Sequence, residues 1–458
     1  MAEEVTGGNI KVPKRILNTL LASLTAGVVP RTGAPYIAIG RKEEISTLLD
    51  DFDTVGEGGA ACRFLIGRYG SGKSFLIQLL RGYALDRGFL TADADLSPER
   101  RLTGGNGAGL ATYRELMMHL SCKTSPEGGA LSSVLSRHFV KMKNEIVADG
   151  ILPEDETFEK ELKKRVILTL SASEESVGGF DFARVLGAYY TASLSDDAEK
   201  KSACLRWLRG EFATRTEAKA ALGFSVGTVI GDDNWYDFVK LFADFSTKLG
   251  YCGLILFIDE CIDLYKIPNR ISREANYEKI LAIFNDTMQG RAASLGVIFG
   301  GTPQFLEDTR RGLFSYEALR SRLADSRYAE LGYRDLSSPV IRLRRLSNNE
   351  LLALVKRLTK LYMQREETEV SPLTDAEIER FLQVSVSRAG AEELLMPREM
   401  IRDYLSLLNI LRDNKDLHFD DVMKDFETKL QEKPLSETSE DGTDKEKKEK
   451  ISLFDLEF

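Results

Sequence analysis

The sequence is poor in the side chains that build zinc sites, disulfides and imidazole catalysis. Its 458 residues contain only 3 histidines, His119, His138 and His418, and no two of them have the spacing of paired metal ligands. The cysteines number 5, form no CxxC pair and mostly lie within apolar runs, which is typical of reduced thiols in a cytosolic protein. These counts exclude a dedicated zinc site and a disulfide framework as the basis of function.

Long apolar runs and a net positive charge are also missing. No run approaches the ~20 residues that a membrane-spanning helix needs, and the N-terminus lacks the charged-then-apolar pattern of a secretion signal. The 62 lysines and arginines against 71 aspartates and glutamates give a net charge of −9. This charge argues against a protein that coats nucleic acid by bulk attraction. We expect a soluble, cytoplasmic protein with no membrane segment.

Short apolar runs that alternate with helical patterns are abundant. The strand-like runs are Arg63–Ile66, Phe89–Ala94, Leu254–Ile258, Val297–Gly300 and Val340–Leu343, and the amphipathic helical patterns are Ser74–Asp86, Arg273–Gln289 and Asn349–Gln364. Strands interleaved with helices predict an α/β fold, with a parallel sheet covered by helices on both faces.

Other regions lack this alternation. Residues 122–233 are rich in Ala, Leu, Lys and Glu, which predicts a helical insertion within an α/β domain of residues 1–345. Helical periodicity without a convincing strand predicts a separate all-helical domain over residues 346–430. Residues 431–458 are polar until the apolar peptide Ile451–Phe458, so we expect a disordered acidic tail. The glycine-rich stretch Gly104–Gly109 is interpreted as a flexible loop.

A phosphate-binding loop is the most specific pattern in the chain. Residues 67–74 fit GxxxxGK[ST] at every fixed position and lie between a strand-like run and a helical run. Glycines let backbone N–H groups converge on phosphate oxygens, and the following helix directs its positive end at the same anion. We expect Lys73 to reach the β- and γ-phosphates and Ser74 to ligate Mg²⁺. The predicted nucleotide-binding residues of the loop are Gly67, Arg68, Tyr69, Gly70, Ser71, Gly72, Lys73, Ser74 and Phe75.

A pair of carboxylates supplies a second part of the same chemistry. The uninterrupted apolar strand Leu254–Ile258 ends in Asp259 and Glu260. Adjacent carboxylates at the end of a buried strand are costly without a cation nearby. We expect Asp259 to hold Mg²⁺ through water and Glu260 to act as the general base that polarises the attacking water. A solvated acidic turn would give the same pattern.

The nucleotide is predicted to be ATP. A guanine site would need the pattern NKxD, and the nearest string, Asn414–Leu417, lacks the final aspartate and lies in the C-terminal helical region. ATP with Mg²⁺ is therefore the expected cofactor pair.

Further residues are candidates for sensing or completing the site. Thr302 follows an apolar strand and could sense the γ-phosphate or orient water, although a plain strand-end turn looks the same. The segment Leu319–Leu323 carries two arginines and could supply an arginine finger in trans, or simply form a solvated helix face. Arg398 follows Pro397 at an expected helix start and could swing onto the γ-phosphate; a surface arginine is the alternative.

Together these residues resemble the AAA+ ATPases of the origin-recognition and STAND-like branch, in which the motifs run in this order with a helical lid behind them. The flanking segments are similar to the ATP-binding proteins of BREX-type (bacteriophage exclusion) defence systems, the BrxD-like group. The similarity extends over about Leu20 to Leu323, and it is carried by Gly27–Arg31, Ile39–Glu44, Arg68–Ser74, Leu205–Glu211, Gly250–Leu254 and Gly301–Phe305.

The resemblance implies a P-loop AAA+ parallel sheet flanked by helices, with the C-terminal all-helical domain as its lid. It implies that Gly40 and Arg41 lie against the adenine, and that Arg322 rather than Arg320 is the finger. It also implies an ATPase of prokaryotic antiviral defence, working beside a helicase-like or DNA-modifying partner. A finger acting in trans requires a homo-oligomer.

One observation favours DNA independently of the resemblance. The segment Arg342–Arg365 carries seven basic residues and one acid, which predicts a basic DNA-binding face, although a solvated lid helix would have the same composition. The leading function is an oligomeric ATP-hydrolysing motor or loader. The alternative is a slow-hydrolysing, ATP-dependent switch or scaffold that recruits defence partners, and a small-molecule kinase is less favoured because it needs no finger.

The tail carries one further hypothesis. Apolar side chains reappear in Ile451–Phe458 after a long polar stretch, which is unusual unless something buries them. A peptide that docks on a partner and a segment that folds back onto the protein's own core both explain this pattern.

Overall fold

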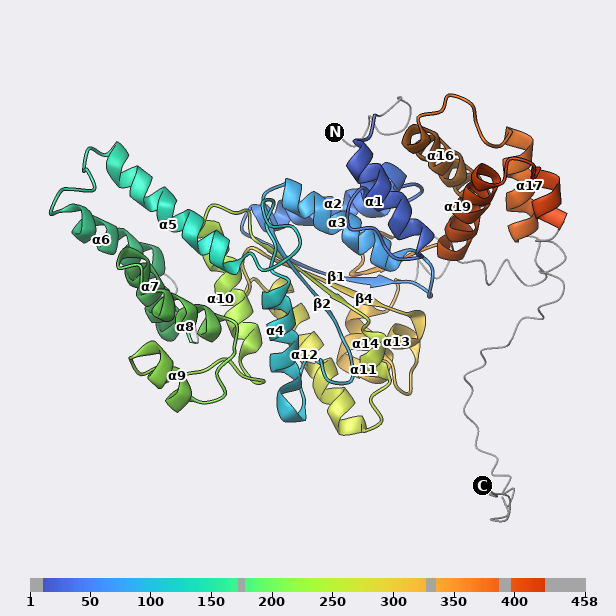
Figure 1. Cartoon of the computed structure of the whole chain (residues 1–458). Coiled ribbons are helices and arrows are strands. Elements are labelled where there is room, and N and C mark those ends of the chain that lie inside the picture. The colour runs from blue at the N-terminus through green and yellow to red at the C-terminus, as the bar shows by residue number, and fades with distance from the viewer. Residues whose placement is uncertain (1–10, 172–177, 327–334, 387–396, 425–458) are drawn as a thin grey trace, which may run out of the picture.

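The computed structural model describes residues 11–171, 178–326, 335–386 and 397–424. Five parallel strands form one sheet in the order β2–β3–β4–β1–β5 (Figure 1). The strands are β1 (Ala60–Ile66), β2 (Leu90–Asp95), β3 (Leu254–Asp259), β4 (Leu295–Gly301) and β5 (Val340–Arg342). The α/β fold with a parallel sheet that the sequence predicts is confirmed.

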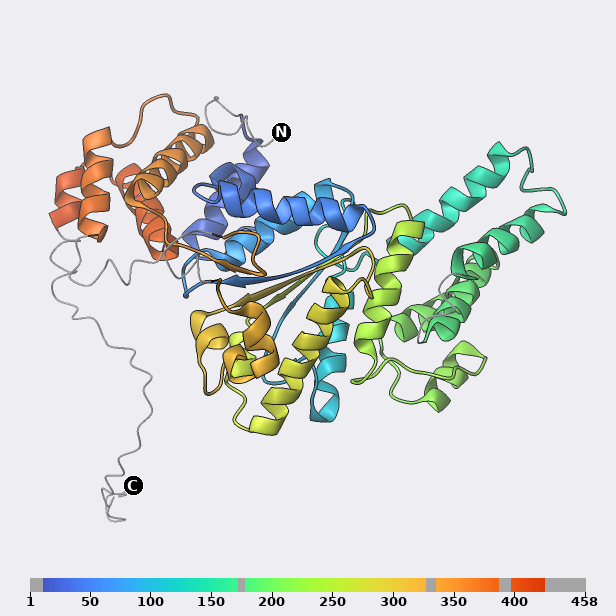
Figure 2. The same cartoon turned by 180° about the vertical axis from the view of Figure 1, so that it is seen from behind.

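Helices cover the sheet on both faces, because neighbouring residues of each strand point to opposite sides. Leu65, Ile255 and Ile298 pack against α2 (Lys42–Gly56) and α3 (Lys73–Asp86). Phe64 and Leu256 belong instead to the core on the opposite face, with α4 (Ala108–Met118), α10 (Trp235–Lys248) and α12 (Arg270–Met288). Figure 2 shows these two layers from behind. All residues of β3 and β4 are buried, which explains why both strands are apolar apart from Asp259 at the end of β3.

A helical arm extends from one side of the sheet (Figures 1 and 2). It consists of α5 (Leu131–Ala148), α6 (Phe158–Ser171), α7 (Gly179–Leu194), α8 (Ala198–Leu208) and α9 (Arg215–Leu222). These helices fall within the predicted insertion of residues 122–233. Their apolar core is continuous with that of the sheet, so the arm is not packed as a separate body.

The glycine-rich stretch is anchored, and its interpretation as a flexible loop is wrong. Residues 105–107 form a 3₁₀ turn, η3 (Gly105–Gly107), ahead of α4. The Asp232 carboxylate accepts the backbone N–H of Gly104 at 2.9 Å and that of Gly109 at 2.5 Å. A Cβ at Gly109 would approach the Leu102 carbonyl to 2.7 Å, so glycine permits close packing here rather than motion.

The C-terminal helices share a core with the N-terminal end of the chain. They are α16 (Asn348–Glu366), α17 (Asp375–Val386) and α19 (Pro397–Asp413), and α1 (Lys14–Thr25) packs against α16 and α19 (Figure 1). Leu20 and Leu21 of α1 are fully buried among residues of these helices. The sequence did not indicate that α1, from the other end of the chain, shares a core with these helices.

Several short elements complete the described chain. They are η2 (Ala34–Ile37), α11 (Ile262–Tyr265), α13 (Pro303–Glu307), η4 (Leu313–Ser315) and α14 (Glu317–Leu323). Within the described ranges no helix is both long and apolar enough to span a bilayer. The predicted tail, with its terminal peptide Ile451–Phe458, lies outside the described residues.

Candidate functional site

The segments that follow β1, β3 and β4 meet at the carboxyl edge of the sheet. The backbone N–H of Gly67, after β1, donates to the Gly301 carbonyl at 3.0 Å. The N–H of Cys261, after β3, donates to the Gly300 carbonyl at 3.0 Å. The predicted phosphate loop, the carboxylates and Thr302 therefore converge on one edge, although they are far apart in the sequence.

The predicted phosphate loop makes a sharp turn into α3. Gly70 and Gly72 have φ values of 74° and 85°, a left-handed conformation that favours glycine. A Cβ at Gly67 would lie 2.3 Å from Ser71 Oγ, whereas a Cβ at Gly72 would meet no atom within 4 Å. Gly72 therefore faces open space directly before the helix N-terminus. An open site at a helix N-terminus suits an anion such as phosphate.

Lys73 and Ser74, the first residues of α3, both contact Asp259 at the end of β3. The Lys73 ammonium forms an ion pair with one carboxylate oxygen, and Ser74 Oγ donates to the other at 2.9 Å. Burial opposes the charge on Lys73, but the Asp259 carboxylate outweighs it and raises the pKa of Lys73. Gly300 makes this arrangement possible, because a Cβ there would lie 2.3 Å from Asp259 Oδ1.

The Ser74 hydroxyl and the Asp259 carboxylate supply the oxygen ligands that Mg²⁺ prefers. Asp259 is only 6% exposed, so its charge needs a nearby cation, which Lys73 supplies here. Among the described residues no group of three or more His, Cys, Asp or Glu side chains is arranged to hold a metal unaided. The residues present therefore fit a magnesium ion that also takes oxygens from nucleotide phosphates and water.

Glu260 adopts a strained backbone conformation next to this cluster. Its φ of 55° lies in the left-handed region, which costs a non-glycine residue about 1–2 kcal/mol. Its N–H donates to Asp259 Oδ1 at 2.8 Å. Burial raises the pKa of Glu260, and the charges of Asp259 and Asp95 add to this while Lys73 opposes it. A raised pKa suits a general base, and such strain is characteristic of functional positions.

Asp95 is a member of this edge that sequence reasoning missed. It ends β2 and pairs in register with Asp259 on β3. Burial raises the pKa of Asp95, and the charge of Asp259 adds to the effect. The available signal was weak: Asp95 directly follows the predicted strand Phe89–Ala94, but the sequence does not show that this strand lies beside Leu254–Ile258.

Thr302 lies at the same edge, directly after β4. It is 7% exposed and caps α13, because Oγ1 accepts the backbone N–H of Phe305 at 3.3 Å. The hydroxyl proton remains to donate to another group.

The hydrogen bonds of the two predicted arginines go to residues outside the phosphate loop. On α14, Arg322 Nε donates to Asn285 Oδ1 at 3.2 Å, and Nη1 donates to the Ala318 carbonyl at 2.8 Å. Arg398, on α19, donates to the backbone carbonyl of Gly27. In the described part of the chain, no hydrogen bond or ion pair joins either arginine to residues 67–74.

Arg41 and Gly40 occupy different surroundings. Arg41 is 6% exposed, forms an ion pair with Glu44 at 3.3 Å, and donates from Nη2 to the Ser71 carbonyl at 2.8 Å. It therefore supports the predicted phosphate loop from within the protein. Gly40 lies against the start of α16, where a Cβ would approach Glu350 Oε1 to 2.6 Å. Contact of either residue with adenine remains a prediction.

Ion pairs neutralise much of the predicted DNA-binding face. Arg342 pairs with Asp325 at 2.5 Å, Arg344 with Glu350 at 2.5 Å, and Lys356 with Asp375 at 2.9 Å. The acids come from outside the Arg342–Arg365 segment except for Glu350, so local composition could not reveal them.

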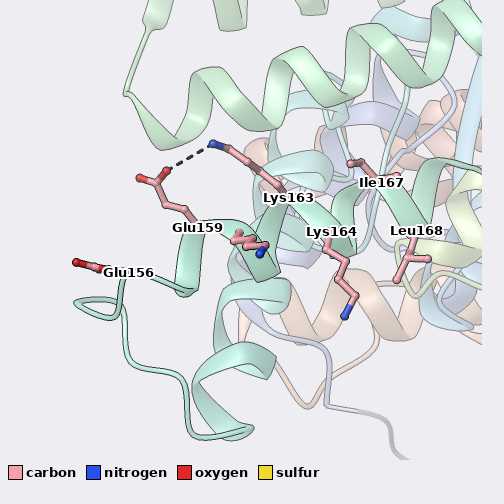
Figure 3. Close-up of a pocket in the computed structure, with 7 residues that line it drawn as sticks. Glu156, Glu159, Lys163, Lys164, Ile167 and Leu168 are labelled. Atoms are coloured by element: carbon pink, nitrogen blue, oxygen red, sulfur yellow. Dashed lines mark ion pairs between the residues drawn. The ribbon is translucent and has the colours of Figure 1, made fainter.

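A cavity of about 550 Å³ lies on the arm, along the outer face of α6 (Figure 3). Lys163 points toward Glu159, while Ile167 and Leu168 are more than half exposed. The residues lining the cavity are Glu156, Glu159, Lys160, Lys163, Lys164, Ile167 and Leu168. None belongs to the predicted site.

The sheet order, the glycine turn into α3 and the acidic end of β3 are consistent with an α/β protein of the P-loop type. The chain belongs to the family of BREX system ATP-binding proteins, BrxC/D, whose model matches residues 12–427. The similarity that the sequence indicates is confirmed, and family membership supports ATP as the ligand. No curated protein matches the chain.

Proposed function

We propose that this protein binds and hydrolyses ATP in phage defence, in the cytoplasm, where ATP is supplied. The observation that carries the proposal is the convergence of Lys73 and Ser74 on Asp259 beside an open helix N-terminus. Lys73 leaves Asp259 and binds the β- and γ-phosphates, while backbone N–H groups of residues 67–74 surround the phosphate chain. Ser74 and, through water, Asp259 hold Mg²⁺, which offsets phosphate charge.

Glu260 performs the hydrolytic step in this proposal. Its carboxylate takes a proton from water as the water oxygen attacks the γ-phosphorus and the bond to the β-phosphate oxygen breaks. Thr302 donates its free hydroxyl proton to a γ-phosphate oxygen or to the attacking water. Gly40 and Arg41 border the adenine side, and Arg41 also supports the loop through the Ser71 carbonyl.

Two arginines are proposed to complete the site, one through assembly and one through closure of the helical lid. Arg322, exposed on α14, acts as a finger on the nucleotide of a neighbouring copy in a homo-oligomer, and Arg398 reaches the γ-phosphate when the helical lid of residues 346–430 closes. The assembly acts on DNA or on a helicase-like, DNA-bound defence partner. The Arg342–Arg365 face contributes to DNA contact through cations released from their present ion pairs.

A slow-hydrolysing switch or scaffold is the second candidate. It is favoured by the engagement of Arg322 with Asn285 and of Arg398 with Gly27, and by the ion pairs across the basic face. In that case ATP binding, rather than turnover, controls the recruitment of partners.

Turnover measurements separate the two candidates. ATP hydrolysis per protomer is measured across a range of protein concentrations, with and without duplex DNA, beside mass photometry under the same conditions. A motor is expected to assemble with ATP and to turn over faster with DNA. Assembly with ATP and unchanged slow turnover would support the switch, and no ATP binding would contradict both.

A further inference from the structure

Asp95, the last residue of β2, shares a face of the sheet with Asp259, the proposed metal-binding residue. Asp95 pairs in register with Asp259, so their side chains point to the same side of the sheet. Asp93, two residues earlier on that side, forms an ion pair with Arg81 of α3 at 3.0 Å. Asp95 therefore faces the side covered by α3, the helix that begins with Lys73.

The strand order fixes where Asp95 lies relative to the phosphate loop. β2 is at one edge of the sheet, and β3 and β4 separate it from β1, at ~4.8 Å per strand. Asp259 is therefore between Asp95 and the loop, so Asp95 cannot take over the contacts with Lys73 and Ser74. It lies on the other side of Asp259 from the loop, and its negative charge adds to the burial that raises the pKa of Glu260, the residue after Asp259.

The Asp95 carboxylate is available for a ligand. Its residue is exposed at the edge, and within the described ranges its side chain has no hydrogen bond or ion pair; only its backbone carbonyl accepts, from Arg100 Nε at 3.0 Å. Partial burial of the carboxylate and the charges of Asp259 and Asp93 raise the pKa of Asp95, and the charges of Arg100 and Lys73 offset this only in part.

We propose that Asp95 is a positioning residue of the hydrolytic centre, which accepts a hydrogen bond from the water that Glu260 deprotonates. The inference rests on the proposed ATPase function. Water has two protons: Glu260 takes one, and Asp95 holds the other, so that the oxygen lone pair points at the γ-phosphorus. Asp95 exchanges no proton itself, and the bonds formed and broken are those of the hydrolytic step above. Holding the nucleophile in this way lowers the barrier without strengthening ATP binding.

The test compares Asp95→Asn with Asp95→Glu and with Glu99→Gln. Glu99 is an exposed acid just beyond β2, whose carboxylate accepts from Ser97 Oγ at 3.2 Å, so its change controls for the loss of a nearby negative charge. Asp95→Asn is expected to lower kcat ~10–100-fold, the scale of misplaced reactants, with unchanged ATP affinity and melting temperature. Asp95→Glu should recover part of kcat, and Glu99→Gln should match the wild type.

A double variant tests whether the two carboxylates act on one water. Glu260→Gln with Asp95→Asn is expected to hydrolyse ATP no more slowly than Glu260→Gln alone. Wild-type turnover by Asp95→Asn, or a loss of ATP affinity and stability that parallels the loss of kcat, would overturn the proposal. If Lys73→Ala still abolished ATP binding in that case, the proposed function would stand. A wild-type protein that binds ATP without hydrolysing it would overturn the Asp95 role and leave the switch.

Discussion

Lys73 and Asp259 form an ion pair across the carboxyl edge of the sheet, so the proposed phosphate-binding cation is held by the proposed metal-binding carboxylate. Both side chains are largely buried, and each neutralises the other. In the proposed function, Lys73 would exchange Asp259 for phosphate oxygens, and Asp259 would then be free to hold Mg²⁺ through water. The ion pair would keep both side chains in position before the nucleotide arrives, which would reduce the entropy lost on binding.

Replacing Lys73 is expected to abolish this exchange. Lys73→Ala removes the ammonium that is proposed to contact the β- and γ-phosphates, so the affinity for a fluorescent ATP analogue should fall at least tenfold, about 1.4 kcal/mol. Lys123→Ala is a matched control. Lys123 is an exposed lysine that forms an ion pair at 3.1 Å with Asp86, the last residue of α3. An unchanged affinity in Lys73→Ala would refute the phosphate-loop assignment.

Glu260→Gln is expected to separate binding from hydrolysis. The amide keeps the size of the side chain and leaves Asp259, Ser74 and Lys73 intact, but it cannot accept the proton from water. ATP affinity should stay near that of the wild type, and the nucleotide recovered from the protein should be ATP rather than ADP. Hydrolysis at the wild-type rate would assign the general base to another residue.

The Arg344–Glu350 pair predicts a defined dependence of stability on pH. Glu350 lies in the first turn of α16, where it closes a capping box with Ser347, and its hydrogen bonds from Arg344 and Ser347 hold its pKa at about 2, below the ordinary 4.5. The depressed pKa means that the carboxylate stabilises the folded state above pH 4.5, and that this contribution is lost as the pH falls toward 2.

Urea unfolding of Glu350→Gln beside the wild type measures this contribution. The variant should be less stable at pH 7, and the difference in the free energy of unfolding should shrink as the pH falls below about 4.5. Arg344→Ala, which removes the partner instead, should show a similar loss at pH 7. A difference that does not change with pH would mean that packing, rather than charge, accounts for the effect.

Local sequence patterns predicted the parallel strands and the turn at the start of α3, because strands, glycine turns and helix starts depend on neighbouring residues. The turn at Gly70–Gly72 and the strand that delivers Asp259 are of this kind. The proposed role of Asp95 could not be inferred from the sequence, because it depends on β2 lying beside β3 although residues 96–253 separate them. The packing of α1 against α19, and the pairing of Arg342 with Asp325, also depend on contacts that no local pattern encodes.

The last prediction concerns Arg322 and its proposed action on a neighbouring copy. Arg322→Ala should lower ATP hydrolysis by ~10³–10⁵-fold, the range of arginine fingers, and leave ATP affinity nearly unchanged. Arg320→Ala is the matched control, because Arg320 lies on the same short helix and is also exposed. The expected difference between the two variants follows from position alone, since both remove one guanidinium from α14.

Mixing variants tests whether the arginine acts in trans. Arg322→Ala protomers keep a working phosphate loop, and Lys73→Ala protomers keep a working arginine, so a mixed oligomer contains complete sites at some interfaces. The mixture should therefore recover part of the wild-type activity, although each variant alone is inactive. Turnover per protomer should also rise with protein concentration as oligomers form. Concentration-independent hydrolysis without recovery in the mixture would instead indicate a monomeric ATPase, in which the hydrogen bond from Arg322 to Asn285 has a structural role.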